Sequence, residues 1–235
     1  MFALVCISAG MFFLVAQVLY IREILIVAYG NELCLGFIFI AWFLGITSGA
    51  GSGAKVTGNK ERNLQNLVLV VISLCFLLVL ETVVVRSLRS LFFTRTGEYL
   101  SFQKLLAGIL ITVTPFSFLI GFFFPLACQV LSQLYKVKGG VLAVGFVYVW
   151  EALGSVIGGI AFSFILVFLF KTFQIIFILG GIFLGIVIFW LFMMGRKKLG
   201  FIITSVFLLC IPISLSSAPN IAILGILVIS VKISG

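Results

Sequence analysis

The stretch from Val141 to Phe170 constrains the fold most, because Glu151 is its only acidic or basic residue. A run this long and this apolar is typical of a membrane-crossing helix, which needs about 20 consecutive apolar residues. Of the whole chain, 63% of the residues are hydrophobic and 9% are charged, against about 25% charged residues in a soluble globule. Because the apolar runs do not alternate in polarity, we predict an all-α, polytopic integral membrane helix bundle.

Seven apolar runs predict about seven transmembrane helices in a single domain over residues 1–235. The expected spans are residues 2–29, 33–54, 64–85, 105–128, 141–170, 172–194 and 199–215. A shorter apolar tail, residues 221–231, follows, and whether it spans the membrane stays open. Residues 86–104 mix Arg with Leu and Phe, so we expect a connection that lies along the membrane interface.

The net charge of +9 comes from fifteen Lys and Arg against six acidic residues. The basic residues lie mainly in short loops, where contact with anionic lipid headgroups explains them without a nucleic-acid partner. Their distribution predicts a cytoplasmic N-terminus, with the loops holding Lys60 and Lys197 on the same side. The basic residues of the third connection count against this orientation unless that connection docks on the outer interface. We expect a bacterial or archaeal cytoplasmic membrane.

The chain has no His and no Asp, and its five cysteines are isolated from one another. His-based zinc sites, His general bases and Asp-based magnesium sites are therefore excluded, and we expect neither a metal nor another cofactor. No pair of residues provides a nucleophile with a base, so we expect no catalytic residue in this chain.

Glu151 is the main candidate for a site, because a charge that faces lipid costs about 2.5–3.5 kcal/mol. On a helix it shares one face with Tyr148, Ser155 and Gly158, so we expect it to point into the bundle. Two interpretations stay open: a structural carboxylate that joins two helices, or one that binds a substrate or a proton. Arg22 and Gln17 of the first helix are the expected partners.

Other polar residues within or beside the apolar runs complete the candidate substrate-binding set. These are Arg22, Glu23, Gln17 and Glu81, together with Glu151, Tyr148 and Ser155. Two groups of glycines predict close helix packing, because small residues let helix backbones approach each other in lipid. The groups are Gly45, Gly49 and Gly53 in the second run, and Gly154, Gly158 and Gly159 in the fifth. Pro115 and Pro125 predict a bent or broken fourth helix.

Two stretches together carry a family resemblance. They are Gln17-x4-Arg22-Glu23-x6-Gly30-Asn31-Glu32-Leu33-x2-Gly36 followed by Trp42-x2-Gly45-x3-Gly49, and Gly121-x3-Pro125-Leu126 followed by Tyr148-x2-Glu151-Ala152-Leu153-Gly154-Ser155-x2-Gly158-Gly159. Over nearly the whole chain they resemble the N-terminal membrane domain of membrane-bound spermidine-synthase-like proteins. That domain is itself similar to half of a major facilitator transporter. The resemblance implies a half-facilitator bundle and a polyamine-like substrate.

The family's soluble domain carries aminopropyl transfer with catalytic aspartates, and this chain has no Asp. The chain itself therefore cannot hold that active site. The first function we consider is handling or transport of a small cationic, polyamine-like substrate. The alternatives are a membrane anchor or scaffold for a separate or missing C-terminal aminopropyltransferase-like domain, or a subunit of a transferase complex. A homodimer is the other assembly considered.

Overall fold

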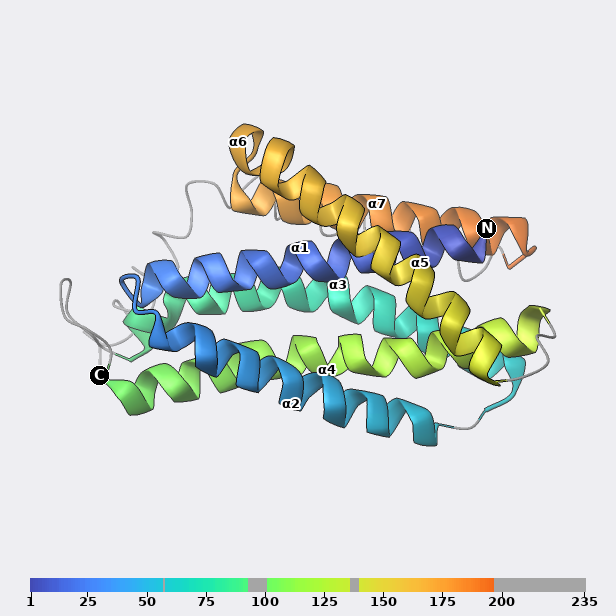
Figure 1. The fold of residues 1–235 in the computed structure, drawn as a ribbon, viewed down its shortest axis with the longest axis horizontal. Coiled ribbons are helices and arrows are strands. Elements are labelled where there is room, and N and C mark those ends of the chain that lie inside the picture. The colour runs from blue at the N-terminus through green and yellow to red at the C-terminus, as the bar shows by residue number, and fades with distance from the viewer. Residues whose placement is uncertain (57, 93–100, 136–139, 197–235) are drawn as a thin grey trace, which may run out of the picture.

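The computed structural model describes residues 1–56, 58–92, 101–135 and 140–196, and every regular element in them is a helix (Figure 1). The helices are α1 (Phe2–Val27), α2 (Leu33–Lys55), α3 (Lys60–Leu91), α4 (Phe102–Tyr135), α5 (Gly140–Ala161), a π-helical segment (Phe162–Leu166), α6 (Val167–Leu169) and α7 (Thr172–Met193). The all-α prediction is confirmed.

Within the described residues, six helical segments are long and apolar enough to cross a membrane. They are Phe2–Val27, Leu33–Lys55, Lys60–Arg89, Phe102–Tyr135, Gly140–Leu169 and Thr172–Met193. Their length and composition fit an integral, multi-pass membrane protein in a lipid bilayer. The expected seventh span, residues 199–215, and the tail 221–231 lie outside the described residues.

Helices α3 and α4 are longer than the sequence predicted, so the expected bounds of the connection, residues 86–104, are wrong. Its expected place along the membrane interface stays a prediction, and residues 93–100 lie outside the described residues. Helix α3 continues to Leu91, and α4 already begins at Phe102. The basic residues Arg86 and Arg89 therefore belong to the last turns of a helix. Arg86 pairs with an acidic residue of α1, and Arg89 donates a hydrogen bond to the carbonyl of Val27 at 3.1 Å. Because Arg86 and Arg89 have these partners on α1, their charged side chains do not require α3 to end before them.

Helix α4 stays continuous through Pro115 and Pro125, so a break there is wrong, whereas the predicted bend at these prolines stays a prediction. The fifth predicted span does contain an irregularity: α5 ends at Ala161, and the π-helical segment Phe162–Leu166 joins it to α6, which ends at Leu169. Helix α1 ends at Val27, two residues before the predicted end, because Tyr29 and Gly30 take positive φ angles of 54° and 75°. Such left-handed residues end a helix.

Two pairs of helices pack in parallel along their lengths: α1 with α5, and α2 with α4. Figure 1 shows α5 crossing in front of α1 and α4, and α2 crossing in front of α4. Helix α3 packs against α1 and α4, and α7 packs against α1 and α3. Because lipid supplies no hydrophobic force between helices, close backbone contact has to hold these pairs together.

The α2–α4 contact depends on three glycines at four-residue spacing. A methyl group built on Gly49 would overlap the carbonyl of Phe118, and one built on Gly53 would lie 2.7 Å from Pro125 Cγ. Gly45 meets Ser117 in the same way, one turn earlier. These glycines therefore form the seam along which α2 lies on α4.

The α1–α5 contact depends on glycines from both helices. A methyl group on Gly154 would overlap the carbonyl of Ile7, and one on Gly158 would lie 2.9 Å from Met11 Cα. Gly159 faces the side chain of Leu14, with 3.0 Å between its built methyl group and Leu14 Cδ2. On α1, Gly10 is just as closely approached by the Glu151 carbonyl. The sequence analysis missed Gly10, because this isolated glycine lacks the regular spacing that marked the others.

Candidate functional site

Glu151 lines a pocket of about 490 Å³ between α2, α4 and α5. The lining residues are Ile46, Ala50, Ile120, Gly121, Phe124, Tyr148, Glu151, Ala152 and Ser155. Glu151 lies eleven residues after Gly140, or about 16 Å along the helix, which is near the middle of the Gly140–Leu169 span. The pocket walls are predominantly apolar, and the Glu151 carboxylate is the one acidic or basic group among the lining residues.

One oxygen of the Glu151 carboxylate is an unsatisfied hydrogen-bond acceptor in the described structure. Its Oε2 atom is buried and has no hydrogen-bond partner among the described residues. The hydroxyl of Ser155 does not supply one, because it lies 3.2 Å from the carbonyl oxygen of Gly10 and 3.1 Å from the backbone oxygen of Glu151, and donates there. Ser155 therefore stabilises the contact between α1 and α5 through its bond to Gly10. Tyr148 lines the pocket and is exposed.

The predicted partners of Glu151, Arg22 and Gln17, are wrong. The carbonyl of Glu151 meets α1 at Gly10. Gln17 and Arg22 follow seven and twelve residues later, about 10 and 18 Å further along α1. Arg22 is exposed and lines a different pocket, of about 690 Å³, beside Tyr29. Among the described residues, the thiols of Cys6 and Cys128 lie close enough to Glu151 to interact with its charge.

Glu23 is committed to contacts between helices. Arg86 of α3 donates from Nε to Oε2 at 2.7 Å and from Nη2 to Oε1 at 2.8 Å. The Thr172 hydroxyl of α7 donates to Oε1 at 2.7 Å, and the Arg86 guanidinium lies 4.7 Å from the centre of the Phe173 ring. The residue is 4% exposed. Glu23 thus joins α1, α3 and α7, and we no longer count it as a substrate-binding residue.

Arg86 and Thr172 were missed as partners of Glu23, although a signal for them existed. Helices α1 and α3 cross the membrane in the same direction, so the ends of the two runs lie at the same side. An acidic residue near the end of one and a basic residue near the end of the other can then meet. The beginning of α7 lies at that side as well.

Glu81 lies in the bundle between α1, α3 and α4, and it is 5% exposed. Its Oε2 atom accepts a hydrogen bond of 2.5 Å from the Tyr20 hydroxyl of α1. Its Oε1 atom is buried and has no partner in the described part of the chain. The carboxyl group faces neither Arg22 nor Glu151, so the predicted substrate-binding residues do not converge on a single site.

An amide cluster at the α2–α3 turn was not predicted. The Nδ2 atom of Asn63, a fully buried residue, lies 3.1 Å from Gln129 Oε1, 3.2 Å from Gln133 Oε1 and 3.2 Å from the carbonyl oxygen of Gly58. Gln133 also donates to the Gly58 carbonyl at 3.1 Å. The cluster fastens the turn and the start of α3 to the last turns of α4. Neutral amides at scattered positions have no charge or spacing that would mark them in a sequence.

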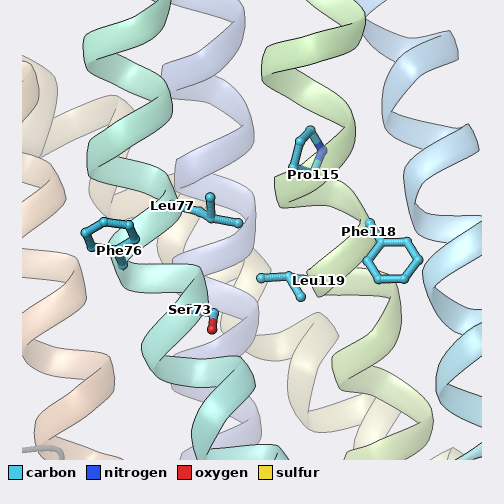
Figure 2. A pocket seen from close by; sticks show the side chains of 6 residues that line it. All are labelled: Ser73, Phe76, Leu77, Pro115, Phe118 and Leu119. Carbon is cyan, nitrogen blue, oxygen red and sulfur yellow. The ribbon is translucent and has the colours of Figure 1, made fainter.

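A groove of about 430 Å³ between α3 and α4 is lined by Ser73, Phe76, Leu77, Pro115, Phe118 and Leu119. Figure 2 shows Leu77 and Leu119 extending into the space between the two helices, with the Pro115 ring above them. Among the residues that line this groove, the only polar side-chain group is the Ser73 hydroxyl. The groove therefore suits a hydrocarbon chain rather than a charged substrate.

The described residues contain no group of three or more His, Cys, Asp or Glu side chains that could hold a metal ion. Comparison of the chain with protein-family models, curated proteins and solved structures gives no match. Of the candidate acidic residues Glu23, Glu81 and Glu151, only Glu151 lines one of the three pockets described above.

Proposed function

We propose that the pocket at Glu151 binds a small cationic substrate, and that the helix bundle handles or transports this substrate in the membrane. The observation that carries the proposal is the buried, unpartnered Oε2 atom of Glu151 in a pocket near the middle of its span. A carboxylate in hydrocarbon needs a cation or a set of hydrogen-bond donors to remain charged. A bound ammonium group supplies both.

The pocket suits an organic cation in its size and lining. Its volume of about 490 Å³ lies within the common range for small-molecule sites, about 300–1,000 Å³. The apolar walls at Ile46, Ile120 and Phe124 would contact methylene groups, and the aromatic ring of Tyr148 could face an ammonium group. The more specific choice of a polyamine comes from the resemblance to spermidine-synthase-like membrane domains.

A second function is a membrane anchor or scaffold for a separate or missing aminopropyltransferase-like domain, and a specific observation favours it. Of the other acidic residues inside the described spans, Glu23 and Glu81 bond to neighbouring helices, and Glu61 at the start of α3 pairs with Arg196. In a scaffold, Glu151 would only contribute to the packing of α5 against its neighbouring helices.

Binding of labelled spermidine to the purified protein separates the two functions. We expect Glu151→Gln to abolish binding and proteoliposome uptake while the melting temperature stays near that of the wild type, because Gln keeps the size of the side chain. Glu32→Gln is the matched control, because Glu32 is an exposed acidic residue in the turn before α2.

Normal binding by the Glu151→Gln protein would refute this site. A folded wild-type protein that binds no polyamine and no other organic amine would refute the transport function and leave the scaffold.

We also propose that the N-terminus is cytoplasmic, and the contacts of the third connection support this. The basic residues among residues 86–104 counted against that orientation, but three of them make contacts that stabilise the helix bundle. Arg86 pairs with Glu23, Arg89 stacks 3.6 Å from the centre of the Tyr29 ring, and Lys104 donates to the carbonyl of Phe92 at 3.1 Å. Arg95 lies outside the described residues.

A further inference from the structure

The pair of Tyr20 and Glu81 is the feature that the proposed function does not use. Tyr20 is 1% exposed and Glu81 is 5% exposed, so the bundle rather than lipid surrounds both side chains. The phenol hydroxyl and Oε2 are 2.5 Å apart, which is short for a hydrogen bond, while Oε1 has no partner in the described part of the chain. None of the three pockets described above is lined by Glu81.

No helix packed against Glu81 brings a cation to it. On α1, Tyr20 contacts Glu81, and one turn further on Glu23 is bonded to Arg86 and Thr172. Arg22, between them in the sequence, is exposed and lines the pocket beside Tyr29. Arg86 lies five residues further along α3 itself and is occupied by that pair.

The other two neighbouring helices add no charge. Helix α4 passes Glu81 at Phe116, and its ionisable residues, Lys104, Cys128 and Tyr135, are at least twelve residues away, about 18 Å or more. Helix α7 contains no ionisable side chain between Thr172 and Met193.

We propose that Tyr20 and Glu81 form a proton-binding site inside the bundle, in which Glu81 carries a proton while α1, α3 and α4 are packed as they are here. In this state the carbonyl oxygen Oε2 accepts the hydrogen bond from Tyr20, and Oε1 holds the proton. In the described residues, the donors near this carboxyl group are the Tyr20 hydroxyl and the backbone N–H of Phe116. With no cation beside them, an ionised carboxylate in apolar surroundings is far less stable than the neutral acid. The proton is released when these helices separate and water reaches the group.

The site therefore makes the α1–α3 contact partly dependent on a proton. One turn away, the Glu23–Arg86 pair joins the same two helices without needing one. The proposal is independent of the Glu151 pocket, because it depends only on groups from α1, α3, α4 and α7.

Infrared spectroscopy of the protein in lipid at neutral pH tests the proton directly, because a protonated carboxyl group has a C=O stretching band that a carboxylate lacks. The Glu151→Gln background removes the carboxyl group of Glu151, which also has a buried oxygen without a partner among the described residues. In that background we expect one such band, which disappears in Glu81→Gln and shifts in Tyr20→Phe because the hydrogen bond to Oε2 is lost. Glu32→Gln should leave the band unchanged.

Thermal unfolding supplies a second readout. A folded state that holds a proton which the unfolded state releases becomes less stable as the pH rises. The melting temperature of the wild type should therefore fall relative to that of Glu81→Gln at higher pH. Should the Glu81→Gln protein not fold, the band shift in Tyr20→Phe and the loss of the wild-type band at alkaline pH carry the test. Absence of a carboxylic acid band at neutral pH, or its survival in Glu81→Gln, would overturn the proposal.

Discussion

Replacing Arg86 with Met removes the cation from a buried pair and keeps an apolar side chain of similar length. Of its donors in the described part of the chain, Glu23, at 4% exposure, would then retain the Thr172 hydroxyl. Breaking a buried ion pair on one side costs about 3–5 kcal/mol. The Arg86 side chain is 34% exposed, which weakens the pair, so we expect a loss of about 3 kcal/mol in the free energy of unfolding.

The double variant Glu23→Gln with Arg86→Met measures the coupling itself. Gln in place of Glu leaves no uncompensated charge in the bundle, so the double variant should lose less stability than the two single variants together. We expect a coupling free energy of about 2 kcal/mol between the two sites, within the usual range for direct partners. Thr172→Val should cost about 1 kcal/mol, as is typical of one hydrogen bond between membrane helices.

Reversible unfolding in mixed micelles of dodecylmaltoside and sodium dodecyl sulfate provides these free energies. Tryptophan fluorescence can follow it, because Trp190 is buried against Phe2 with 5.2 Å between the ring centres. Additive losses in the single and double variants would show that the two residues do not interact and would refute the assignment of Glu23 to a structural role.

Two further predictions concern packing and orientation. Gly49→Leu should lower the melting temperature in detergent by several degrees or prevent folding, because the leucine side chain would meet the α4 backbone at Phe118. Gly51→Leu on the same helix should have little effect, because a methyl group built on Gly51 meets nothing within 4 Å. Equal melting temperatures for the two variants would contradict the α2–α4 seam. A single cysteine at position 60, replacing Lys60 in a background without native cysteines, should resist impermeant thiol reagents in intact cells and react after lysis, and labelling from outside would reverse the proposed orientation.

The sequence by itself determined the class of the protein and the approximate position of six helices. Apolar runs of sufficient length leave the backbone no alternative to a helix in lipid, so the runs mark the spans directly. The spacing of Gly45, Gly49 and Gly53 likewise marked a packed face, because residues four apart lie on one side of a helix. Helix ends were less well predicted, since Arg86 and Arg89 look like loop residues until their partners are known.

Only the tertiary structure decided which polar groups meet. Glu23 and Arg86 are sixty-three residues apart, and so a local pattern cannot pair them. The neighbours of Glu151 depended on the register of α5 against α1, which Gly10 and Gly154 set through backbone contact. A shift of two or three turns would have brought Gln17 or Arg22 to the carboxylate. Helix periodicity fixes the face of each side chain, whereas register and rotation between helices arise from packing. In the described residues, packing left the Glu151 Oε2 atom without a hydrogen-bond partner and placed Glu81 beside the Tyr20 hydroxyl.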